Sequence, residues 1–126
     1  MDTGWPILEA LAVAWLSEHL DVGVSTDLPK DVETRHPDGF VRVSRGPGSD
    51  DGITDEPLLD VEAFHPDRIK AARLAERART AVHAMRGRLV TGELVDAVNT
   101  ATGPNWVYYG PNVERYVASY RVAYRR

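Results

Sequence analysis

Apolar residues recur along the chain with two different periods, and each period predicts a type of element. Residues 5–20 place apolar side chains such as Leu8 at helical spacing, which indicates an amphipathic helix. The same spacing, built largely from alanines, predicts a longer helix over residues 68–86. Asp67 is a suitable N-cap for the longer helix, and Gly87 is a suitable residue to end it.

Short runs of strand-forming residues predict strands in the remaining segments, and apolar and polar residues alternate in the runs at 40–45, 57–65 and 116–124. We expect strands at residues 22–26, 40–45, 57–65, 94–102, 106–109 and 116–124. Turns are expected at residues 103–105 and 110–112, where glycine, proline and asparagine follow one another. In the last strand, Tyr116, Tyr120 and Tyr124 fall on one face.

This order of elements predicts an α+β fold formed by a single domain over residues 1–126. We expect one mainly antiparallel sheet of about four to six strands, with two helices packed on one face. The strands at 40–45 and 57–65 form a β-hairpin with a long acidic, glycine-rich tip.

The residues contain no evident catalytic or cofactor-binding arrangement, so we expect neither an enzyme nor a cofactor. The chain has no cysteine, and none of its four histidines has the spacing of a recognised metal site. Asp50, Asp51 and Asp55 are suitable oxygen ligands for a hard cation, but the distal glutamate of an EF-hand loop is missing. We interpret these carboxylates as a solvated acidic turn, and we expect no bound metal.

A metal-dependent nuclease is an alternative that the residues favour weakly. Asp60 and Glu62, together with Lys70, loosely resemble a carboxylate–carboxylate–lysine arrangement. Lys70, however, follows Pro66 and lies on the predicted helix rather than on the strand that carries the two acids. Alternating acids on an exposed strand face need no catalytic explanation.

The net charge of −4 conceals a strong asymmetry along the chain. Residues 1–66 carry 14 acidic and 4 basic side chains, whereas residues 67–126 carry 5 acidic and 11 basic side chains. Either the opposite charges meet within one folded monomer, or the acidic side of one subunit meets the basic side of the next. The basic face of the helix at 68–86 also leaves nucleic-acid binding open.

Several short motifs together resemble one family of proteins. They are Thr26-Asp27-Leu28-Pro29, Phe40-Val41-Arg42-Val43-Ser44-Arg45-Gly46, Thr54-Asp55, Leu59-Asp60-Val61-Glu62-Ala63-Phe64, Thr102-Gly103-Pro104-Asn105-Trp106, Pro111-Asn112-Val113 and Arg115-Tyr116-Val117-Ala118-Ser119-Tyr120-Arg121. With the helices between them, these motifs make nearly the whole chain resemble the tail terminator proteins of long-tailed (siphovirus-type) phages of actinobacteria.

The resemblance implies a structural virion protein, assembled in the host cytoplasm and located at the head-proximal end of the tail. Such proteins form a homohexameric ring that caps the tube of major tail protein, ends its polymerisation and joins the tail to the head-side connector. The genome DNA passes through this ring without specific binding. We expect no membrane partner, because the apolar run at residues 10–16 is too short to span a bilayer.

Two groups of residues are candidates for contacts in such a ring. Asp50, Asp51, Thr54 and Asp55 form a loop that we expect to face the lumen or the tube, where acidic groups repel DNA. The candidates for contacts with a neighbouring subunit or the connector are Arg68, Arg73, Arg77, Tyr120 and Arg121. A head-completion or stopper protein of the same junction, or a small nucleic-acid-binding protein, is the alternative.

Overall fold

The computed structural model describes residues 7–46 and 57–125 of the 126-residue chain. The elements in these two stretches are α1 (Ile7–His19), β1 (Gly23–Ser25), α2 (Val32–Arg35), β2 (Phe40–Arg45), β3 (Leu58–His65), α3 (Arg68–His83), β4 (Leu89–Val90), β5 (Glu93–Trp106) and β6 (Glu114–Arg125). The expected α+β class is confirmed.

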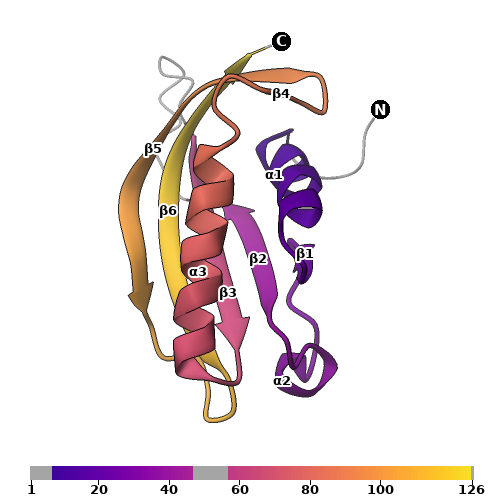
Figure 1. Ribbon diagram of the computed structural model, residues 1–126, viewed down its shortest axis with the longest axis vertical. Helices are drawn as coiled ribbons and strands as arrows, with labels where there is room; N and C mark the ends of the chain where they lie inside the picture. The colour runs from indigo at the N-terminus through magenta and orange to yellow at the C-terminus, as the bar shows by residue number, and fades with distance from the viewer. Residues whose placement is uncertain (1–6, 47–56, 126) are drawn as a thin grey trace.

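The strands form one six-stranded sheet in the order β1-β2-β3-β6-β5-β4 (Figure 1). β1 pairs with β2 in parallel, and every other neighbouring pair is antiparallel. The parallel pair is possible because the segment containing α2 carries the chain back to the end of the sheet where β1 begins. The sheet is therefore mixed rather than purely antiparallel, with its one parallel pair at an edge.

Helices α1 and α3 cover one face of the sheet, as the sequence predicts (Figure 1). Leu16 of α1 and Leu74 of α3 belong to one buried cluster with Val41 and Leu59 of the strands. Burying each such side chain contributes roughly 1.5–3 kcal/mol, so this layer supplies most of the favourable energy of folding. We call this side of the sheet the covered face.

A buried hydrogen bond joins the two helices directly. Trp15 Nε1 donates to the carbonyl oxygen of Ala81 over 2.7 Å. This bond satisfies the one polar atom that Trp15 brings into the apolar layer. No helix in the described part of the chain is long and apolar enough to cross a membrane.

The predicted start of α3 is confirmed by its cap geometry. Asp67 has an extended backbone, and its side chain accepts a hydrogen bond of 3.0 Å from the backbone N–H of Lys70. This hydrogen bond lowers the pKa of Asp67 below its usual value. At the other end α3 stops at His83, three residues earlier than predicted, and Gly87 has a φ of +79°.

The opposite face of the sheet, which we call the polar face, has a smaller apolar cluster at one end. Val32 of α2 packs there with Phe40, Phe64 and Val113, and Leu28 is partly buried against them. The cluster lies on the polar face because side chains alternate between the two faces along a strand. Phe40 of β2 and Phe64 of β3 are paired and point away from the covered face. The cluster fixes α2 and the end of the β5–β6 loop to the sheet.

Two local predictions are wrong, and two short elements were not predicted. β5 continues through residues 103–105, where we expected a turn, because shifts of register against β6 absorb the extra residues. Residues 107–109 belong to a loop rather than to a strand. The short elements α2 and β4 are absent from the prediction, since neither is long enough to show a period.

Candidate interaction surface

Exposed apolar side chains gather at the end of β5 and in the loop that follows it, and we call this region the aromatic tip. The tip comprises Trp106, Val107, Tyr108 and Tyr109. Tyr108 is 62% exposed and Trp106 is 37% exposed. Since large apolar residues are usually buried, four consecutive exposed ones indicate a surface that contacts another molecule.

The aromatic tip is held to the sheet by Arg115. The guanidinium of Arg115 donates to the carbonyl oxygens of Val107 and Tyr108, at 3.4 Å and 3.3 Å. It also lies 5.3 Å from the ring centroid of Tyr109, and that ring packs edge-on against Phe64. These contacts pre-organise the tip, which reduces the entropy that a partner must overcome on binding.

Arg115 is itself part of an ion-pair network on the polar face. Glu62 accepts hydrogen bonds from Arg42 at 2.6 Å and from Arg115 at 3.0 Å, and its side chain is only 12% exposed. The hydrogen bond to Glu62 raises the pKa of Arg42. Beside this network, Ser119 donates to Asp60 over 2.6 Å. Glu62, Arg42 and Arg115 are thus paired with one another within the monomer.

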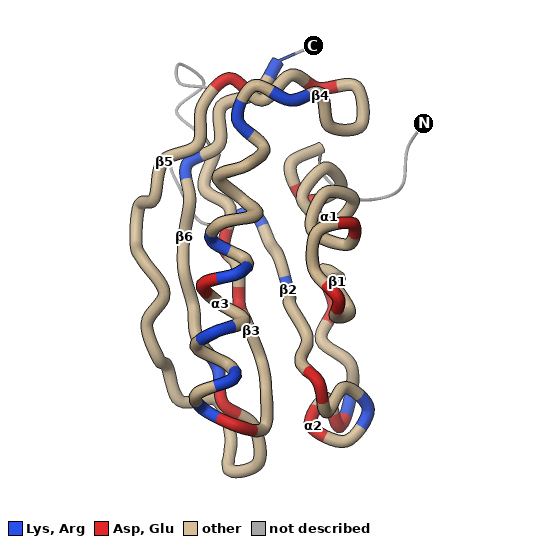
Figure 2. Tube along the Cα trace, viewed as in Figure 1, with Lys and Arg blue, Asp and Glu red and all other residues tan. Residues whose placement is uncertain are grey.

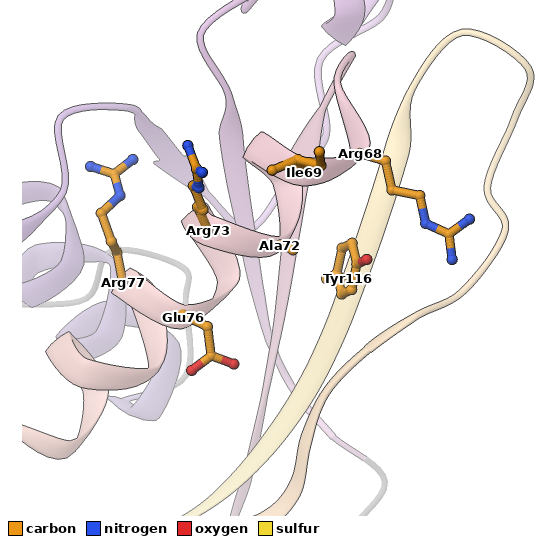
Figure 3. Close-up of a pocket in the computed structure, with 7 residues that line it drawn as sticks. All are labelled: Arg68, Ile69, Ala72, Arg73, Glu76, Arg77 and Tyr116. Carbon is orange, nitrogen blue, oxygen red and sulfur yellow. The ribbon is translucent and has the colours of Figure 1, made fainter.

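A shallow groove lies on the outer surface of α3, on the covered side of the molecule (Figure 3). We call it the α3 groove; its volume is about 650 Å³, and its exposed lining is almost entirely apolar. The residues that line it are Arg68, Ile69, Ala72, Arg73, Glu76, Arg77 and Tyr116.

The helical period explains why α3 has this second apolar surface. Leu74 and Ala78 turn inward to the sheet, whereas Ile69 and Ala72 fall outside that stripe. Ile69 is 64% exposed, although isoleucine is one of the residues most often buried. Tyr116 of β6 completes the floor of the groove from the sheet (Figure 3).

Cationic side chains surround the α3 groove, and only part of their charge is neutralised. Arg77 forms an ion pair of 2.9 Å with Asp21, and its guanidinium lowers the pKa of that carboxyl. Arg68 stacks over the Trp106 ring at 4.3 Å, which links the groove to the aromatic tip. Arg73 forms no ion pair within the described residues, and neither does Lys70, which lies on α3 outside the lining of the groove.

The structure locates most of the contact residues that the sequence predicts. Arg68, Arg73 and Arg77 are brought together at the α3 groove. Arg121 is exposed on the polar face, opposite Leu58 of β3, and lies apart from these three arginines. The predicted loop residues Asp50, Asp51, Thr54 and Asp55 lie outside the described residues.

The assignment of Tyr120 as a contact residue is wrong. Its side chain is completely buried in the cluster beneath α3, and its hydroxyl has no hydrogen-bond partner within the described chain. Burial raises the pKa of Tyr120 to about 12. Its strand alternation correctly indicated one apolar face, but alternation cannot distinguish a face covered by a helix from one covered by a partner.

The residues of the nuclease alternative are not brought together. Asp60 and Glu62 lie on the polar face, bonded to Ser119 and to two arginines. Lys70 lies on α3, which packs against the opposite face of the sheet. Among the described residues, no group of histidine and carboxylate side chains is arranged to hold a metal ion.

Sequence reasoning missed Ile69 and Ala72 as parts of a surface. The available signal was Ile69, an isoleucine between Arg68 and Lys70 that falls outside the inward stripe of its helix. Tyr116 belongs to an aromatic group, completed by Trp106, Tyr108, Tyr109, Tyr120 and Tyr124, for which the sequence leaves a core and an interface role open. Its position in the groove depends on how the sheet and the helix pack.

No protein-family model matches this chain, and no curated protein matches it significantly. The interpretation of function therefore depends on the residues, on their motifs and on the geometry of these two surfaces.

Proposed function

We propose that this protein is a structural subunit of a phage tail, a tail terminator. Copies form a ring, expected to be hexameric, at the head-proximal end of the tail. The ring caps the tube of major tail protein, stops its polymerisation and presents a surface to the head-side connector. The genome passes through the ring.

The observation that carries this proposal is the pair of exposed apolar surfaces on a small, otherwise well-packed monomer. Five of the seven large apolar side chains exposed in the described residues are Ile69, in the first turn of α3, and the four of the aromatic tip. The start of α3 and the end of β5 lie at the same end of the molecule (Figure 1). Trp, Tyr and Arg are the residues that dominate binding energy at protein interfaces. A subunit of a ring needs lateral and axial contacts, and the α3 groove and the aromatic tip provide one candidate for each.

We propose a tail ring in particular because the motifs resemble those of tail terminator proteins. Three residues of the motifs Arg115-Tyr116-Val117-Ala118-Ser119-Tyr120-Arg121 and Pro111-Asn112-Val113 support or line the two surfaces. Arg115 holds the aromatic tip, Tyr116 forms the floor of the groove, and Val113 anchors the loop. Because these residues support contact surfaces, a family of ring-forming subunits would be expected to carry the two motifs together.

The deciding experiment is an assembly reaction with the tail tube protein encoded in the same genome. Tubes polymerised with this protein should carry a ring at one end and stop growing, as seen by electron microscopy. Tubes that grow equally long and carry no added density would refute the proposal. Binding to the head connector without any effect on tubes would support the stopper alternative.

The aromatic tip can be tested in the same reaction. Replacing Trp106 and Tyr108 by serine should weaken capping of tubes or joining of heads about tenfold or more, because both side chains are exposed anchors. Leu89→Ser is the matched control, since Leu89 is 72% exposed but lies on β4 at the other end of the molecule (Figure 1). Normal capping and joining by the double variant would exclude the tip as a contact.

One observation favours a nucleic-acid-binding protein as a second candidate: Lys70 and Arg73 are cations without an ion pair in the described residues. Phosphate binding through these residues would weaken steeply with salt. The apolar lining of the groove and the presence of Glu76 favour a protein partner instead. Titration of duplex DNA at two salt concentrations distinguishes the candidates.

A further inference from the structure

Two regions of the monomer carry opposite charges. Residues 7–38, from α1 to α2, hold seven acidic and two basic side chains. Residues 67–88, around α3, hold two acidic and seven basic side chains. Figure 2 shows the two regions as red and blue positions on separate parts of the molecule. Within the described residues a single ion pair, between Arg77 and Asp21, joins them.

The α3 groove specifies the chemistry of its occupant. Its floor, which includes Ile69, Ala72 and Tyr116, is apolar, and Arg68 and Arg73 lie at its rim. A complementary segment must present apolar side chains flanked by carboxylates. A phosphate backbone would supply the charge but no apolar surface for the floor.

The loop between β1 and α2 has this chemistry. In the run Asp27-Leu28-Pro29-Lys30-Asp31, two exposed acids flank half-buried Leu28 and Pro29 and the exposed Lys30. Leu28 packs partly against its own chain, so Pro29 and the exposed part of Leu28 are the apolar surface that the loop presents. Neither acid forms an ion pair within the described residues. We call residues 27–31 the acidic loop.

The acidic loop cannot fill the groove of its own chain. Leu28 packs against Phe40 and Phe64 on the polar face, whereas the groove is on the covered side of the sheet. The loop follows β1 at one edge of the sheet, and the groove includes Tyr116 of β6, three strands away. Three strand spacings correspond to about 14 Å, and α3 itself lies on the covered side between them. Contact therefore requires a second copy.

We propose that the α3 groove of one copy binds the acidic loop of a second copy, so that the subunits associate head to tail. This inference rests on the proposed function, because it assigns the lateral contact of the ring. The groove and the loop are different surfaces, so the contact is heterologous and repeats from copy to copy. A row of subunits joined in this way closes into a ring when a whole number of the rotations between neighbours makes one full turn.

Reversal of charge on each partner, followed by mixing, tests the contact. The groove variant carries Arg73→Glu, at the rim of the groove, and the loop variant carries Asp27→Lys and Asp31→Asn. Asparagine is chosen because Asp31 has a φ of 52°, which asparagine tolerates. Each variant alone should need at least tenfold more protein to assemble, as measured by native mass spectrometry. An equimolar mixture should recover assembly, because the two variants can alternate around a ring with an even number of subunits.

The matched control is Arg86→Glu, which reverses an exposed cation of the same region outside the groove. Circular dichroism of every variant separates loss of assembly from loss of folding. If the wild-type protein forms rings and both charge variants form them equally well, the groove–loop contact is refuted while the proposed function stands. If the wild-type protein forms no ring, alone or on tail tubes, the proposed function fails as well.

Crosslinking gives a second readout that does not depend on charge. The chain has no cysteine, so Ala72→Cys in the groove and Lys30→Cys in the loop can be combined in one chain without background. Oxidation should produce a ladder of covalent oligomers, because a disulfide forms only between closely placed residues. Pairing Ala72→Cys with Ala14→Cys, on the exposed side of α1, should give no ladder. An identical ladder from both pairs would overturn the assignment.

Discussion

The two faces of the sheet stabilise the protein by different means. The covered face excludes water with mainly aliphatic side chains from α1, α3 and five strands. The polar face carries charged residues that neutralise one another, with Glu62 between Arg42 and Arg115. The first face supplies the energy of folding, and the second positions the aromatic tip through Arg115. Substitutions on the two faces should therefore have different consequences.

The largest effect should follow from a cavity on the covered face. Leu74 is 1% exposed, so Leu74→Ala should lower the free energy of unfolding by about 2–5 kcal/mol. Ile69→Ala, on the outer side of the same helix, should change it by less than about 0.5 kcal/mol. Urea denaturation monitored by circular dichroism measures both. Equal losses would mean that α3 packs in another orientation.

The polar face should respond less strongly to the loss of its central carboxylate. Glu62→Gln leaves Arg42 and Arg115 without their counter-charge and should cost about 1–3 kcal/mol. Asp96→Asn, which affects only an exposed pair with Arg125, should cost about 0–1 kcal/mol. The Glu62 variant should also speed hydrogen exchange in the aromatic tip. An unchanged tip would show that Arg115 does not depend on Glu62.

A small effect of opposite sign is expected from the buried hydroxyl of Tyr120. Tyr120→Phe removes a polar atom that lacks a partner among the described residues, so stability at pH 7 should stay equal or rise by up to about 1 kcal/mol. Because the pKa of Tyr120 is raised to about 12, the unfolded chain ionises first, and stability should fall as the pH rises past about 10. The Tyr120→Phe variant should lose the part of this decrease in stability that Tyr120 causes. Thermal melts at several pH values can measure the difference.

The smallest effect concerns His65, at the rim of the covered face. Its Nδ1 accepts the backbone N–H of Asp67 over 2.9 Å, which requires the neutral ring, and burial lowers the pKa of His65. The unfolded chain therefore takes up the proton first, and stability should fall as the pH drops below about 6.5. His65→Asn keeps an acceptor and should flatten this dependence. Thermal melts from pH 8 to 5 that remain parallel for both proteins would contradict the assignment.

Local patterns predicted the long elements well because those elements follow local rules. The period of α1 and α3, the Asp67 cap and the alternation in β2, β3 and β6 all depend on near neighbours in sequence. The continuation of β5 through Gly103 and Pro104 could not be read in this way. Beyond Leu94, β5 pairs only with β6, and at such an edge a proline need not donate to a second neighbour.

The sequence by itself determined which residues alternate and which charges cluster, because spacing and composition are properties of the chain. Only the tertiary structure decided which apolar residues remain exposed. Tyr120 and Tyr108 are the same residue type, yet α3 buries the first and nothing in the described chain covers the second. Likewise, Ile69 and Tyr116 form one groove because α3 packs across β6. Exposure depends on what lies opposite in space, and that is set by packing between segments distant in the chain.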